Sequence, residues 1–122
     1  MIFTWSTAAY ACVGLTVVSM AVLAWAFWQS PEKGFALSTH TLENLPTVMA
    51  DRYVSFGLIT LGAAIIGGMS MLAWVFLVGA FMGLADGWIY WRAKLKHAKH
   101  TASGLMSAVA AFVCYMAATS PA

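Results

Sequence analysis

The stretch PTVMADRYVSFGLITLGAAIIGGMSMLAWVFLVGAFMGLADGWIYW, which covers residues 46–91, decides the fold of this chain. It holds two long apolar runs separated by Gly67-Gly68, and paired glycines of this kind are typical of a turn. Each run, at about 46–67 and 71–91, has roughly the 20 residues that a helix needs to cross the hydrocarbon core of a bilayer. The stretch therefore predicts two antiparallel membrane-spanning helices joined by a tight turn.

Two further apolar runs flank this pair, at about residues 7–28 and 102–119. The first lacks the basic start and the short apolar core of a cleaved signal peptide, so we expect it to be a retained helix. The predicted fold class is all-α membrane: a single domain, residues 1–122, with four transmembrane helices in an antiparallel up-down bundle. The longest polar stretch, residues 30–46, would form the first cytoplasmic loop and could hold a short interfacial helix.

The composition also predicts a membrane protein. Charged residues make up 8% of the 122 residues and hydrophobic residues make up 62%, whereas an average soluble domain has roughly 25% charged residues. So few charges cannot cover a small protein in water, so the apolar excess must face something else. This excludes an ordinary soluble enzyme, a disordered regulator and a nucleic-acid binder with a broad basic face. The expected partner is the lipid bilayer, with no nucleic acid.

The basic residues predict the orientation in the membrane. Lys33, Arg52 and the four basic residues of the 92–99 segment lie toward one side of the predicted bundle. The turn at 67–70 and both termini carry no Lys or Arg. Because cytoplasmic loops are enriched in Lys and Arg, we expect the basic loops to be cytoplasmic. The predicted location is a bacterial inner membrane, with both termini outside the cytoplasm.

Small residues recur at helical spacing on the last two predicted spans. Gly79, Gly83 and Gly87 share one face of the third span. Gly104 and Ala108 share one face of the fourth. Apolar burial gives no net attraction between helices in lipid, so close backbone approach must supply it. We expect these stripes to pack helices within the chain, with a dimerisation face as the alternative.

Two opposite charges within the predicted spans are the strongest indication of function. Arg52 lies near the start of the second span and Asp86 near the end of the third, so at 1.5 Å per residue both are about 8–9 Å below the same interface. A charge inside a span needs a partner or a water-filled cavity. We therefore expect an Arg52–Asp86 ion pair, which would either fix the register of two helices or mark a polar pocket open to the cytoplasmic leaflet.

Two histidines near the start of the fourth span, His97 and His100, could join this pocket. A His-x-x-His pair can bind a transition metal, but this spacing is common in interfacial loops, so we expect no metal and no cofactor. Asp86 and His100 are the candidate catalytic residues. The predicted ligand-binding residues are Arg52, Asp86, His97 and His100.

The two cysteines, Cys12 and Cys114, lack the C-x-x-C spacing of redox enzymes that act on disulfides. We expect them to be small packing residues, with a redox pair as the alternative. No G-x-S-x-G or H-E-x-x-H motif is present, so the sequence offers no standard hydrolase or metalloprotease signature.

Short motifs spread over the chain carry a resemblance to a known family. They are Ser30-Pro31-Glu32, Leu45-Pro46, Asp51-Arg52 leading into Gly57-Leu58, Ala85-Asp86-Gly87, and His100 before Gly104. From about Tyr10 onward the chain resembles the DoxX-like small four-helix integral membrane proteins of unknown function. The resemblance implies a membrane location and a four-helix bundle, but no settled activity, substrate or cofactor. Arg52, Asp86 and His100 match the family's polar positions, which favours the pocket.

The leading functional hypothesis is a polar pocket at the cytoplasmic leaflet that binds or transforms a small lipophilic molecule. Asp86 would be the acid/base or hydrogen-bonding group, Arg52 would orient it or hold an anion, and His100 would be a second proton carrier. The alternative is a structural or accessory subunit of a larger membrane assembly. Besides the bilayer, the expected partners are a lipophilic small molecule, a second copy of the chain or a larger membrane complex. A transporter is less favoured, because four helices hold little polar lining. Whether the chain is an enzyme stays open.

Overall fold

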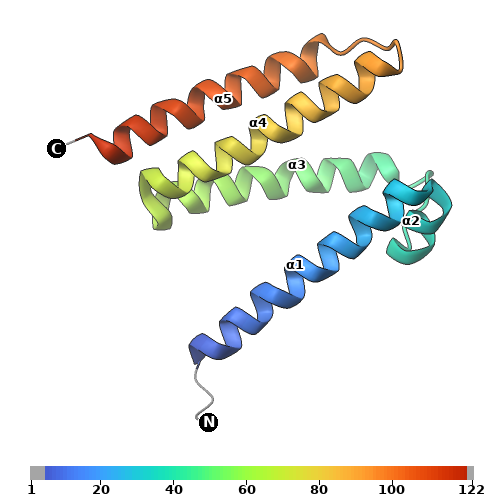
Figure 1. Ribbon diagram of the computed structural model, residues 1–122, viewed down its shortest axis with the longest axis horizontal. Coiled ribbons are helices and arrows are strands. Elements are labelled where there is room, and N and C mark those ends of the chain that lie inside the picture. Colours follow the sequence, from blue (N-terminus) through green and yellow to red (C-terminus); the bar gives the residue numbers. More distant parts are fainter. Residues whose placement is uncertain (1–4, 121–122) are drawn as a thin grey trace. The chain divides into compact units, whose positions relative to one another are not determined.

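All regular structure in the described part of the chain is helical (Figure 1). The computed structural model describes residues 5–120, apart from the side chains at positions 6, 9, 12 and 14. The elements are α1 (Trp5–Gln29), α2 (Pro31–Ser38), α3 (Leu45–Gly62), the π-helix η1 (Ala63–Gly67), α4 (Gly68–Arg92) and α5 (Ala98–Thr119). The chain divides into two units, Met1–Ala50 and Asp51–Ala122, and the division falls within α3.

The first unit contains α1 and the short helix α2, which pack against each other. Ser30 separates them: its hydroxyl accepts a hydrogen bond from the backbone N–H of Lys33 at 3.2 Å, which caps α2. The rings of Phe27 and Phe35 then meet edge to face, with centroids 5.3 Å apart. Gly34 packs against the Phe27 ring, where a Cβ atom would collide with it. The helix predicted within the 30–46 loop is therefore present as α2.

Each predicted span falls on a helical stretch, although the boundaries differ. Two stretches are long and apolar enough to cross a membrane, Leu45–Arg92 and Ala98–Thr119. The first contains α3, η1 and α4. α5 begins at Ala98, so the helix includes the predicted fourth span, about 102–119, and one turn before it. That first turn contains the polar residues Lys99 and His100.

The chain reverses direction between α3 and α4 (Figure 1). The last turn of the incoming helix widens into the π-helix η1, and Gly68 follows with φ +72° and ψ −168°. This conformation is essentially restricted to glycine, because a Cβ atom would clash with the neighbouring backbone. The paired glycines thus mark the reversal that the sequence predicted: Gly68 is needed for its backbone conformation, and a Cβ atom on Gly67 would collide with the Met71 side chain.

α4 and α5 lie side by side and antiparallel (Figure 1). Their backbones meet at Gly83 and Gly104, where a Cβ atom on Gly83 would lie 2.5 Å from the backbone nitrogen of Gly104. Gly87 packs against Thr101, and the Cα of Gly79 faces the Ser107 side chain. The predicted small-residue packing within the chain is therefore confirmed for α4 and α5.

The loop after α4 has a Schellman arrangement. Lys94 adopts a left-handed conformation with φ +58°, its N–H donates to the Trp91 carbonyl at 3.0 Å, and the Leu95 N–H donates to the Tyr90 carbonyl at 2.9 Å. These bonds satisfy carbonyl groups at the end of the helix. The Arg92 guanidinium lies over the Trp88 ring, 4.7 Å from its centroid. The basic segment thus begins at a defined helix end.

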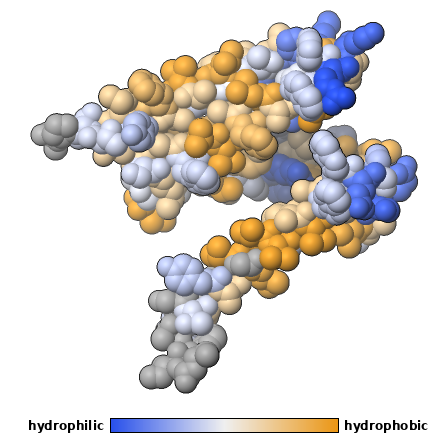
Figure 2. Space-filling model, in the orientation of Figure 1, coloured by the Kyte–Doolittle hydropathy of each residue, from blue (hydrophilic) through white to orange (hydrophobic). Residues whose placement is uncertain are grey.

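Few side chains are buried. Among the described residues, the buried apolar ones are all alanines: Ala26, Ala63, Ala80 and Ala111. Large apolar side chains lie outside, including Ile66 at 86% and Phe81 at 73% exposure. Figure 2 shows hydrophobic residues over the visible face of α4 and α5, with hydrophilic residues gathered around the loop that joins them. Such a surface is suited to an apolar surrounding and not to water.

Candidate functional site

A cavity of about 490 Å³ opens between α3, α4 and α5, and all of its lining residues belong to the second unit. Its volume lies in the range of small-molecule sites. Most of its lining is apolar and aromatic, and the polar residues come from all three helices. The lining residues are Tyr53, Phe56, Ile59, Thr60, Trp74, Val75, Phe76, Val78, Gly79, Met82, Gly83, Asp86, His100, Ser103 and Ser107.

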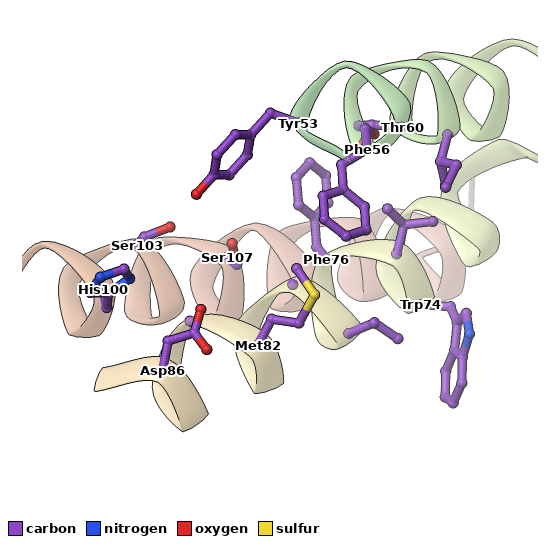
Figure 3. Close-up of a pocket in the computed structure, with 15 residues that line it drawn as sticks. Tyr53, Phe56, Thr60, Trp74, Phe76, Met82, Asp86, His100, Ser103 and Ser107 are labelled. Atoms are coloured by element: carbon purple, nitrogen blue, oxygen red, sulfur yellow. The ribbon is translucent and has the colours of Figure 1, made fainter. Parts of the chain in front are cut away.

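The cavity lies between α3 and the α4–α5 pair, and side chains from all three helices line it. The large side chains of Phe56 and Phe76 project into the space between the helices (Figure 3). The glycines Gly79 and Gly83, which let α5 approach α4 closely, also lie along the floor of the cavity.

The polar groups gather on the α5 side and at the Asp86 end. His100, Ser103 and Ser107 are spaced three and four residues apart, which places them on one face of α5. Asp86 lies opposite on α4, and Tyr53 extends from α3 with its hydroxyl toward the α5 side (Figure 3). One molecule in the cavity could therefore contact an acid, an imidazole and hydroxyl groups together.

Several of these groups have free hydrogen-bonding capacity. Ser55 and Thr60 on α3 donate their hydroxyls to carbonyls of their own helix, at 3.0 and 2.9 Å. Ser103 and Ser107 make no such bond, and within residues 5–120 neither they nor the Asp86 carboxylate have a hydrogen-bond partner. Asp86 and Ser103 are exposed and Ser107 is half-buried, so these three side chains are open to a ligand or water.

His100 is held in place by a ring contact. Its imidazole lies on the Tyr90 ring of α4, with centroids 4.6 Å apart and planes 33° apart. This contact restricts the rotamers of a half-buried side chain that lines the cavity. His100 and Asp86, the two candidate catalytic residues, thus line one cavity, although no ion pair joins them in the described structure.

His97 lies outside this cavity lining. It precedes α5, and its Nδ1 lies 3.0 Å from the Thr101 hydroxyl. Thr101 in turn packs against Gly87 of α4. The arrangement gives His97 a structural contact at the start of α5, and of the two histidines only His100 lines this cavity.

Arg52 also lies outside the cavity lining, and its side chain is exposed. The predicted Arg52–Asp86 ion pair is absent: among the described residues, no Lys, Arg or His nitrogen lies within 4.0 Å of the Asp86 carboxylate. The prediction matched the depth of the two residues along their helices. Asp86 lines the cavity and Arg52 does not, so equal depth does not bring the two side chains together.

The two cysteines line neither side of this cavity in the described structure. The side chain of Cys12 lies outside the described part of the structure, and Cys114 is half-buried on α5.

Two lining residues, Tyr53 and Ser103, were not predicted from the sequence. The spacing of Ser103 and Ser107 from His100 was the available signal, because it extends the histidine into a polar stripe on one helix face.

The chain belongs to a family described as a domain of unknown function, DUF4267, whose model matches residues 7–115. This match shows no link to the DoxX-like proteins, so that resemblance stays a prediction. No curated protein and no solved structure shows significant similarity to the chain.

Proposed function

We propose that this chain is an integral membrane protein that binds a small lipophilic molecule in the cavity between α3, α4 and α5. The observation that carries the proposal is the lining: apolar and aromatic walls, with Asp86, His100, Ser103 and Ser107 along one side. A largely apolar pocket with a few convergent polar groups is the usual form of a small-molecule site. The apolar walls would hold the body of the ligand, and the polar stripe would orient it.

The proposed setting is a bilayer that the chain crosses four times, through α1, the two arms of Leu45–Arg92, and α5. The length and apolar character of Leu45–Arg92 and Ala98–Thr119 support this arrangement, as does the reversal at Gly68. The basic loop from Arg92 to Lys99 would lie in the cytoplasm. The Asp86 end of the cavity would then open near the cytoplasmic leaflet of a bacterial inner membrane, with both termini outside.

The same residues support a proton-transfer step on the bound molecule. A carboxylate and an imidazole that line one cavity can act as base and acid on a ligand held between them. Asp86 would accept a proton from the ligand and His100 would return one at another atom, which is the requirement for an isomerisation. Arg52, outside the lining, has no part in this step.

Mass spectrometry of the purified protein tests the binding proposal. The wild-type chain, extracted from its native membranes in mild detergent, should retain a lipophilic molecule. Asp86→Asn should lose about tenfold or more of it, because a hydrogen bond to a charged group contributes about 1.5–3 kcal/mol. The matched control is Asp51→Asn, which makes the same change on α3 outside the lining. Equal retention in both variants, or no retained molecule in the wild type, would contradict the proposal.

A second candidate function is a structural or accessory subunit of a larger membrane assembly. A second hollow of about 450 Å³ on α4 and α5, lined by Leu77, Ala108 and Phe112 among others, favours it, because small and apolar residues of this kind receive helices in membranes. Purification in mild detergent separates the two functions: a partner protein should co-purify if this one holds. A chain that always runs alone or as a homo-oligomer would exclude it.

A further inference from the structure

We infer that the cavity selects a lipophilic cation: a molecule with a protonated amine or similar positive head on a single apolar chain. The inference rests on the proposed function and specifies the ligand class of the same site. Among the described residues, Asp86 is the only Asp or Glu that lines the cavity, and neither Lys nor Arg lines it. The cavity therefore offers a ligand head one carboxylate and no permanent positive charge. This reverses the expectation that Arg52 would hold an anion.

The surroundings of Asp86 favour a positive ligand head for a second reason. Within residues 5–120 the carboxylate has no basic partner in the chain, and a charge within a membrane-spanning helix is stable only when something compensates it. A bound cation would supply that compensation. An anion would place two negative charges together in a region of low dielectric constant, where their repulsion is strong.

The aromatic walls act in the same direction. Tyr53, Phe56, Phe76 and Trp74 all line the cavity. The faces of aromatic rings attract cations and repel anions, because the ring quadrupole is negative above its plane. The hydroxyls of Ser103 and Ser107 can accept hydrogen bonds from an ammonium group. Each of these groups tolerates a neutral head, but only a cation gains from all of them.

The cavity also suggests the shape of the ligand. It follows α4 from Asp86 to Trp74, which is about 18 Å along the helix axis at 1.5 Å per residue. Between these ends the lining of α4 is apolar, and includes Val75, Val78 and Met82. A ligand with its head at Asp86 would therefore extend a single chain toward Trp74.

Tryptophan quenching in lipid nanodiscs tests this inference. The probes are ω-bromoundecylammonium and ω-bromoundecanoate, which have the same chain, opposite head charges and a bromine that quenches tryptophan on contact. The Trp74 signal is isolated as the difference between the wild type and Trp74→Phe. At equal amounts of membrane-bound probe, the ammonium ion should half-saturate this signal at a concentration about tenfold or more below that of the carboxylate.

Three variants separate charge recognition from loss of folding. Asp86→Asn should abolish the preference for the ammonium ion, and Asp86→Glu, which keeps the charge, should restore most of it. Asp51→Asn should keep the full preference. If both probes quench Trp74 equally, or the carboxylate binds more tightly, the charge inference is wrong while the proposed lipophilic site stands. If neither probe quenches Trp74, the proposed function itself is overturned.

Discussion

α5 and α3 both border α4, yet the two borders are built in opposite ways. Along α5, glycines remove side chains until the two backbones meet at Gly83 and Gly104. Along α3, a cavity lies between the two helices, and Phe56 lines it. The comparison shows that two kinds of contact can share one helix. The close contact with α5 fixes the position of α4. The side of α4 that faces α3 then forms the floor of the cavity.

The largest expected loss of stability comes from adding a side chain where the backbones of α4 and α5 meet. Gly83→Ala places a methyl group 2.5 Å from the backbone of Gly104, so the helices must separate. We expect Gly83→Ala to be less stable than Gly57→Ala by about 1–3 kcal/mol, the usual cost of overpacking. Gly57 is the matched control, because it gains the same helix propensity and has nothing within 4 Å of the added Cβ atom. Denaturant unfolding in detergent micelles measures the difference, and equal stabilities would contradict the close border.

The second-largest expected loss of stability is at Gly68, where the chain reverses direction between α3 and α4. Gly68→Ala forces an alanine into φ +72° and ψ −168°, which should cost about 1–3 kcal/mol. Gly62→Ala is the control, because Gly62 has an ordinary helical φ of −60° and open space around an added Cβ atom. The same unfolding measurement applies. A Gly68→Ala variant as stable as the control would show that the chain does not reverse through this conformation.

A smaller effect is expected where the α4–α5 border meets the loop. Thr101→Val removes the hydroxyl that contacts His97 Nδ1 at 3.0 Å but keeps the branched shape of the side chain against Gly87. The loss of one hydrogen bond should destabilise the protein by about 0.5–1.5 kcal/mol. Thr119→Val, which alters only a bond within the last turn of α5, serves as the control. Hydrogen exchange of the first turn of α5 should rise in Thr101→Val alone.

The smallest expected effect on stability is at the cavity between α3 and α4. Phe56→Ala should change the free energy of unfolding by no more than about 0.5 kcal/mol, because Phe56 is 40% exposed and lines a cavity that already exists. A phenylalanine packed in a closed core would cost about 3–5 kcal/mol on the same substitution. A loss of that size would show that α3 packs tightly and would remove the contrast between the borders. The variant should instead weaken binding of the bromoundecyl probes.

The sequence predicted the helices well because their signals are local. The apolar lengths and the paired glycines at 67–68 placed the reversal, and the spacing of Gly79, Gly83 and Gly87 predicted the close border. The π-helix η1 was not predicted, since a widened turn leaves no periodic pattern of its own. The short helix α2 was foreseen as a possibility, and its Ser30-Pro31 start is the signal that supports it.

The candidate site was predicted only in part, because a site depends on distances between helices. Asp86 and His100 were selected as polar residues within spans, and both line the cavity. Arg52 was selected by depth alone, and depth along a helix does not determine how near the neighbouring helix lies. His97 was grouped with His100 by spacing, but one residue lies before α5 and the other in its first turn. Which of two nearby histidines reaches a cavity depends on where the helix begins.

The close border between α4 and α5 has a consequence for the order in which the protein assembles. Its contacts join consecutive helices through one short loop, so the entropy lost on closing that loop is small. Contacts that are local along the chain form fast. The α4–α5 hairpin is therefore suited to form first during membrane insertion and to serve as a template. α3 can then settle beside it without breaking any contact, which leaves the ligand cavity as the last feature of the fold to be completed.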